Sequence, residues 1–181
     1  MSVAHHWVVT AFIAPPPRML WYLRLGLSIA QRRAGRELLP AQLLAWYPRA
    51  AVSSAVLEAL VAHHDGRLDE RMLKLVRMAV SFTVNCSFCI GLNSLGWESV
   101  MSPTELEAVQ GRSSLALFAQ PERLAIEYAR LASATPLSIP PAFGARMAAE
   151  FTPRELVVLA TTIAQVNYWA RLASGLGESG E

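Results

Sequence analysis

Apolar residues recur every three or four positions along most of this chain, and this helical period constrains the fold more than any other feature of the sequence. Leu20, Leu23, Leu27 and Ala30 form one such stripe, and Gly35 ends it. No segment alternates between apolar and polar residues for long enough to indicate a strand, and no glycine-rich loop follows an apolar run. The sequence therefore predicts an all-α protein and disfavours a nucleotide-binding sheet.

Three helix starts are visible in the sequence. Ser-Pro-Thr-Glu at 102–105 and Thr-Pro-Arg-Glu at 152–155 are capping boxes with proline at the first helical position. Asp69 can cap a helix that extends to about Val84, and since that helix is apolar on most sides, we expect it to be central. The other helices are expected over residues 19–33, 40–46, 49–64, 86–98, 121–134, 140–150 and 155–174.

The length and the N-terminal composition suggest a simple domain organisation. The 181 residues fit one domain with a substantial core. Residues 1–18 show no clear period and contain three successive prolines, so we expect an N-terminal arm, followed by a single helical domain over 19–181.

Composition narrows the set of partners. Hydrophobic residues make up 53% of the chain and charged residues only 17%, which predicts that another copy covers part of the surface. The net charge is +2 and no basic stripe is interleaved with aromatics, so nucleic acid is not an expected partner. No stretch reaches the roughly 18 apolar residues that span a bilayer, and the apolar segment 7–14 lacks a basic leader. We therefore expect no membrane association and a cytoplasmic location.

Cys86 and Cys89 are the only cysteines, and they stand three positions apart. At a helix start this spacing puts both sulfurs on one face, close enough to bridge or to share a ligand. The unpaired amides of a helix N-terminus lower a thiol pKa, and a second sulfur one turn away can resolve an oxidised one as a disulfide. The pair thus predicts a redox cycle, with two ordinary buried cysteines as the alternative.

A zinc site is the rival use of the pair. Structural zinc needs four ligands. His5, His6, His63 and His64 are adjacent doublets far away in sequence, without the spacing of a zinc finger. The sequence therefore implies no metal, and it implies no flavin or nucleotide cofactor either.

Two stretches carry a resemblance to a known family. The apolar segment 69–93 leads into Cys86-x-x-Cys89, and the segment 151–172 runs from Phe-Thr-Pro-Arg-Glu to Asn-Tyr-Trp-Ala-Arg-Leu. Together they resemble the carboxymuconolactone decarboxylase and AhpD-like (alkylhydroperoxidase) family over about residues 19–177. The resemblance implies an AhpD-like helical bundle that assembles as trimers, or as hexamers built from them. It also implies cysteines that reduce hydroperoxides or exchange disulfides and are recharged by a dithiol reductant partner.

This sequence has only some of the functional residues that are typical of the family. Active AhpD-like enzymes typically have a glutamate twelve residues before the first cysteine, where this chain has Lys74, and a histidine four residues after the second, where it has Asn93. Those groups relay a proton that activates the thiol, so only Cys86 and Cys89 transfer as matching catalytic residues. Lys74 is the only lysine of the chain. We hypothesise that its ammonium favours the thiolate by charge pairing and that Asn93 donates a hydrogen bond to it.

Three functions follow from the sequence. The first is a thiol peroxidase or disulfide reductase that acts through reversible oxidation of Cys86 and Cys89. The second is a non-enzymatic helical subunit whose cysteines sense redox state or stabilise an assembly, which the missing glutamate and histidine keep open. The third is a cofactor-free lyase like the decarboxylase that names the family, which the lack of an acid and base in the cysteine segment disfavours.

Overall fold

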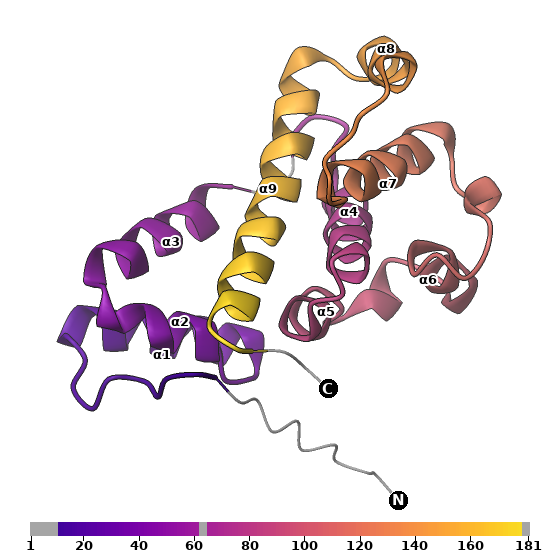
Figure 1. Cartoon of the computed structure of the whole chain (residues 1–181). Coiled ribbons are helices and arrows are strands. Elements are labelled where there is room, and N and C mark those ends of the chain that lie inside the picture. The colour runs from indigo at the N-terminus through magenta and orange to yellow at the C-terminus, as the bar shows by residue number, and fades with distance from the viewer. Residues whose placement is uncertain (1–10, 62–64, 179–181) are drawn as a thin grey trace, which may run out of the picture.

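The computed structural model describes residues 11–61 and 65–178, and the regular structure in these ranges is helical apart from one isolated bridge between Asp65 and Leu68. The α-helices are α1 Trp21–Ala34, α2 Leu39–Leu43, α3 Pro48–Leu60, α4 Glu70–Thr83, α5 Ser87–Asn93, α6 Pro103–Val109, α7 Gln120–Ser133, α8 Pro141–Glu150 and α9 Pro153–Gly175 (Figure 1). The 3-10 turns are η1 Leu44–Trp46, η2 Trp97–Ser99 and η3 Leu115–Leu117. The predicted all-α fold is confirmed. Within the described ranges, no helix combines the length and the apolar content that a membrane span needs.

Helix α4 is the centre of the core. It packs against α5, α7 and α9, which surround it in Figure 1. Leu75, Val76, Met78 and Val80 are fully excluded from solvent, as expected for a helix that is apolar on most sides. Cutting one of them back, as in Leu75→Ala, would cost about 2–5 kcal/mol, because the rigid surroundings would not collapse into the cavity.

The predicted helix starts form as expected. The Ser102 hydroxyl accepts from the Glu105 amide at 3.3 Å, and the Glu105 carboxylate accepts from the Ser102 amide at 2.7 Å. Thr152 and Glu155 make the same reciprocal pair at 3.3 and 2.9 Å. Asp69 caps α4 by accepting from the Met72 amide at 2.8 Å. These bonds satisfy amides that a helix start leaves unpaired.

Two expected helices end early, and one turn was not expected. The helix predicted over 86–98 stops at Asn93, and Gly96 adopts φ 66° before the separate turn η2. A left-handed residue cannot continue an α-helix, so the chain turns there. The helix predicted over 49–64 ends at Leu60, and residues 62–64 lie outside the described part. The turn η3 lies in a segment for which the sequence predicts no helix.

The described part of the N-terminal arm lies on the helical body. The Phe12 amide donates to the Leu176 carbonyl at 2.8 Å, and the Trp46 indole donates to the Ala14 carbonyl at 2.9 Å. The arm therefore connects η1 with the C-terminal end of α9. Residues 1–10 lie outside the described part of the chain.

Candidate functional site

The cysteine pair lies where the chain reverses between α4 and α5. Asn85 adopts φ 51°, a left-handed conformation that asparagine tolerates better than most residues, and it directs the chain away from α4. Cys86 then takes the N-cap position of α5, and its sulfur accepts from the Cys89 amide at 3.3 Å. The pair thus occupies the first turn of a helix, as the sequence predicted.

The two sulfurs are reduced and lie 2.7 Å apart. A disulfide requires about 2.05 Å, so a small movement would close the bridge. Cys86 is 4% exposed and Cys89 is 1% exposed. The hydrogen bond from the Cys89 thiol lowers the pKa of Cys86, and the amides of the helix start act in the same direction, whereas burial opposes them. The pKa of Cys89 is raised, because its thiol donates to Cys86 and is itself buried. Of the two thiols, Cys86 therefore loses its proton more readily than Cys89.

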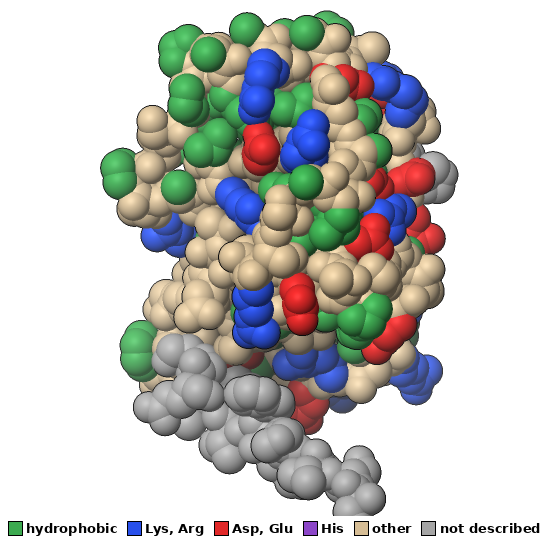
Figure 2. All heavy atoms as spheres, turned by 90° about the vertical axis from the view of Figure 1, so that its right-hand side faces the viewer, with side chains coloured by type: hydrophobic (Ala, Val, Ile, Leu, Met, Phe, Trp, Pro, Cys, Tyr) green, Lys and Arg blue, Asp and Glu red, His purple; other side chains and the backbone are tan. Residues whose placement is uncertain are grey.

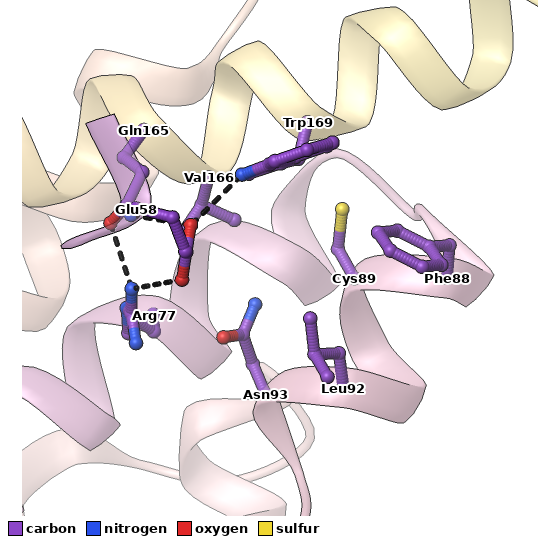
Figure 3. Close-up of a pocket in the computed structure, with 9 residues that line it drawn as sticks. All are labelled: Glu58, Arg77, Phe88, Cys89, Leu92, Asn93, Gln165, Val166 and Trp169. Carbon is purple, nitrogen blue, oxygen red and sulfur yellow. Dashed lines mark hydrogen bonds and ion pairs between the residues drawn. The ribbon is translucent and has the colours of Figure 1, made fainter. Parts of the chain in front are cut away.

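A small cavity adjoins Cys89. Its volume is about 20 Å³, which is room for roughly one water molecule. Helices α3, α4, α5 and α9 contribute its walls, and Figure 3 shows the Cys89 sulfur between the rings of Phe88 and Trp169. The residues that line it are Glu58, Arg77, Phe88, Cys89, Leu92, Asn93, Gln165, Val166 and Trp169.

A polar cluster forms the other side of this cavity (Figure 3). The Glu58 carboxylate accepts from Gln165 at 2.6 Å and from the Trp169 indole at 3.0 Å. The Arg77 guanidinium donates to the Gln165 oxygen at 2.7 Å and lies 3.6 Å from the Glu58 carboxylate. The buried Nε of Arg77 has no hydrogen-bond partner among the described residues. This cluster therefore leaves one buried donor of a cavity-lining side chain without a partner.

Sequence reasoning missed this polar cluster. Its members come from three helices and are separated by up to 111 positions. Arg77 and Gln165 did carry a signal, since each is a long polar residue with an apolar neighbour on both sides.

The two hypothesised supporting residues make other contacts. The Lys74 ammonium donates to the Leu95 carbonyl, and its pKa is lowered by burial and by the like charge of Arg77. Asn93 does line the cavity, but its amide donates to the Ser81 hydroxyl at 3.0 Å. Support of the thiolate by Lys74 and Asn93 therefore remains a prediction.

A further carboxyl lies near the pair and was also missed. Glu178 follows the end of α9 and is 4% exposed. Burial raises its pKa to about 7, although the positive charge of Arg36 acts in the opposite direction. Its negative charge in turn raises the pKa of Cys86 and of Cys89.

Metal-binding clusters of three or more His, Cys, Asp or Glu residues do not occur within the described ranges. The histidines considered for zinc, His5, His6, His63 and His64, lie outside those ranges.

Comparison with known sequences identifies one curated relative. No protein-family model matches the sequence. The uncharacterized protein YnjA of Escherichia coli (strain K12) is 34% identical over 110 residues, which are 60% of this chain and 60% of that protein. The chain thus spans less than two thirds of this relative.

Solved structures show the likeness over a longer range. A variant of the debrominase Bmp8 in complex with 2,3,4-tribromopyrrole matches with a TM-score of 0.79 at 15% identity, covering 95% of this chain and 92% of that one. An uncharacterized peroxidase-related protein from Silicibacter sp. TM1040 gives 0.78 at 13% identity over 96% and 92%. An uncharacterized peroxidase-related protein from Ralstonia eutropha JMP134, described as an alkylhydroperoxidase AhpD core, gives 0.74 at 18% identity over 94% and 92%. By its helices and by this likeness, the chain has the AhpD-like fold.

Proposed function

We propose that this protein is a thiol-dependent peroxidase or disulfide reductase that cycles Cys86 and Cys89 between dithiol and disulfide. The observation that carries the proposal is the position of two reduced sulfurs, 2.7 Å apart, at a helix start beside a small cavity. The peroxidase-related names of two proteins with the same fold support it. A reducing compartment such as the cytoplasm would return the pair to its dithiol form between turnovers.

The proposed reaction conserves atoms and electrons. One sulfur, as thiolate, attacks the terminal oxygen of the hydroperoxide, the O–O bond breaks, and the alcohol leaves after taking up a proton. The resulting sulfenic acid is attacked by the second sulfur, which loses its proton, and water is released as the disulfide forms. A dithiol partner then reduces the disulfide by exchange. The guanidinium of Arg77, which lines the cavity, would hold a peroxide oxygen during the first step.

The cavity sets an expectation for the substrate. Its 20 Å³ admit a molecule of about the size of water, and hydrogen peroxide is only slightly larger. An alkyl hydroperoxide would need the Trp169 ring to move, which breaks its hydrogen bond to Glu58. We therefore expect hydrogen peroxide to react faster than cumene hydroperoxide.

A single-turnover experiment tests the function. Reduced protein is mixed with either peroxide and free thiols are counted with time, in parallel with Cys86→Ser and Cys89→Ser. Fast loss of both thiols, restored by a dithiol, supports the proposal. In the serine variants no disulfide can form within the chain, and the variant that accumulates a sulfenic acid retains the attacking sulfur. Thiol loss no faster than that of a free small thiol would refute the peroxidase.

The alternative is a redox-sensing or structural subunit without turnover. The near-complete burial of both sulfurs favours it, as do Lys74 and Asn93 at the positions of the family's proton relay. In that case oxidation would be slow but would still change assembly or stability. Turnover of a lactone carboxylate by the double serine variant would instead indicate the lyase.

We also propose that the protein is a homo-oligomer, a trimer or hexamer by its resemblance to the family. Helix α1 has no buried residue in the isolated chain, and Trp21, Leu25 and Ile29 form an exposed stripe at four-residue spacing. Helix α3 carries a second stripe with the same spacing, which consists of Val52, Val56 and Leu60. Helices α1 and α3 contact each other, and exposed apolar stripes on neighbouring helices are typical of an interface.

Figure 2 shows the face on the α6–α7 side of the molecule. Basic and acidic side chains are interspersed there, and Arg71 pairs with Glu105 and Glu122. Sedimentation analysis of the wild type and of Leu25→Glu tests the interface, because a charge in the α1 stripe should dissociate the assembly. A wild-type monomer would refute the oligomer.

A further inference from the structure

The end of α9 places a carboxyl where proteins usually place an apolar group. The Glu178 amide donates to the Ala173 carbonyl at 2.9 Å, and the Gly177 amide donates to the Ser174 carbonyl at 3.1 Å, with Gly177 at φ 86°. This is a Schellman motif, whose last residue folds back on the helix and normally makes a hydrophobic contact with it. Here that residue is Glu178, so the motif buries a carboxyl.

The surroundings of Glu178 do not satisfy this carboxyl. Its buried Oε2 has no hydrogen-bond partner among the residues that the structure describes. Helices α2 and α5 both pack against α9 (Figure 1). The charged or titratable groups that act on Glu178 are Arg36, from the connection between α1 and α2, and the two cysteines of α5.

Arg36 is held beside the site by α5. Its guanidinium lies 5.9 Å from the centre of the Phe88 ring, and a Cβ on Gly91 would collide with one of its nitrogens. Because Gly91 has no side chain, the Arg36 guanidinium can occupy this space. The attraction of Arg36 for the Glu178 carboxylate is smaller than the effect of burial, so the pKa of the carboxyl is raised to about 7 and both protonation states are populated near neutral pH.

A buried carboxylate and a buried thiolate repel each other, so the pair and Glu178 compete for protons. Glu178 can therefore release a proton when negative charge leaves the sulfurs and take one up when the charge returns. The proposed reaction needs both events, since the departing alcohol takes up a proton and the second thiol loses one.

We infer that Glu178 is the proton donor and acceptor for the cysteine pair, in place of the glutamate and histidine whose family positions hold Lys74 and Asn93. This inference rests on the proposed function. In the first step the Glu178 carboxyl gives its proton to the leaving alcohol oxygen, directly or through a water. In the second step the carboxylate takes the proton from the resolving thiol, and the resulting thiolate attacks the sulfenic sulfur. The S–S bond forms as the S–O bond breaks, and the leaving hydroxide becomes water by taking up from solvent the proton that the attacking thiol released when it became a thiolate. The carboxyl ends as it began, and the net reaction is one hydroperoxide and two thiols to one alcohol, one water and one disulfide.

The test compares Glu178→Gln with wild type in two assays. The first is the pH midpoint of iodoacetamide alkylation of the pair, and the second is the single-turnover rate with hydrogen peroxide. Loss of the carboxylate should lower the alkylation midpoint, because its charge no longer opposes the thiolate. The same variant should reduce peroxide about 100- to 10,000-fold more slowly near neutral pH, as expected when a positioned acid is lost. Glu178→Asp should recover part of the rate.

A merely damaged site would behave differently. Disruption of the first turn of α5 would return the pKa of the Cys86 thiol toward its ordinary value and so raise the alkylation midpoint. The matched control is Glu107→Gln, which makes the same change of charge at an exposed position on α6. It should leave both the alkylation midpoint and the peroxide rate unchanged. An alkylation midpoint in Glu178→Gln that equals the wild-type value would overturn the inference, and so would an unchanged peroxide rate. Failure of the wild type itself to reduce peroxide would refute the proposed function, whereas the alkylation midpoint would still report whether Glu178 acts on the thiols.

Discussion

Replacement of Glu178 by glutamine should remove a pH dependence of the protein's stability. The ordinary pKa of the carboxyl is 4.5, and burial raises the pKa to about 7 in the folded protein. Between these values the folded chain holds a proton that the unfolded chain has released. The free energy of unfolding therefore falls as pH rises through this window and is constant above it.

The size of the effect follows from the shift. A difference of about 2.5 pKa units, at 1.36 kcal/mol each, corresponds to at most about 3.4 kcal/mol. The effective dielectric constant around buried groups is higher than that of a dry interior and weakens part of the effect, so we expect roughly half of this, about 1.5–2 kcal/mol. Glutamine has the same shape and no charge, so the variant should gain this amount relative to wild type between about pH 5 and about pH 8.

Urea unfolding of both reduced proteins at the two pH values measures the effect. All other titratable groups are common to both proteins, so their contributions cancel in the difference. The Glu155 carboxylate does not interfere, since the Arg67 guanidinium lowers its pKa to about 2, and stability from that pair is lost only as pH falls below about 4.5. A difference between wild type and Glu178→Gln that is the same at both pH values would refute the reasoning.

Three further predictions concern the thiolate, a helix cap and the lone lysine. In Cys89→Ala the pKa of Cys86 should rise toward its ordinary value, because the donating thiol is gone, and the ultraviolet absorbance of the thiolate against pH measures it. Thr152→Ala should cost about 1 kcal/mol in urea unfolding, because the first turn of α9 loses its side-chain cap. Lys74→Met should leave the alkylation midpoint unchanged if its bond to the Leu95 carbonyl is its main role, whereas a raised midpoint would support charge pairing with the thiolate.

Helix positions were predictable because their signals are local. The capping boxes at 102–105 and 152–155 and the cap at Asp69 bind amides only three residues away, so a short window of sequence contains both partners. The early end of α5 was missed because Gly96 was not recognised as a left-handed stop within an apolar segment.

The candidate site was predictable only in part, for the opposite reason. Cys86 and Cys89 meet within one helical turn, so their spacing alone brought the sulfurs together. The Glu58 carboxylate reaches Gln165 and Trp169 across more than 100 positions, and no periodicity specifies such a contact. A single sequence shows which faces are apolar, but not which polar residues meet where the helices pack.

The position of Glu178 depends on one glycine, and this dependence can be tested separately from the carboxyl itself. At Gly177 a side chain would need a left-handed backbone, and its Cβ would stand 2.6 Å from the Phe12 ring of the N-terminal arm. Gly177→Ala should therefore displace the turn that buries Glu178, and the carboxyl should then become solvated. The alkylation midpoint of the cysteine pair should fall, as in Glu178→Gln, although the carboxyl is still present.

Gly96→Ala is the control, because φ there is 66° but no atom lies within 4 Å of the added carbon. Both variants bear the cost of a left-handed alanine, about 1–2 kcal/mol. If both moved the midpoint equally, general loosening would explain the change; a shift confined to Gly177→Ala would show that the end of α9 sets the charge balance at the sulfurs.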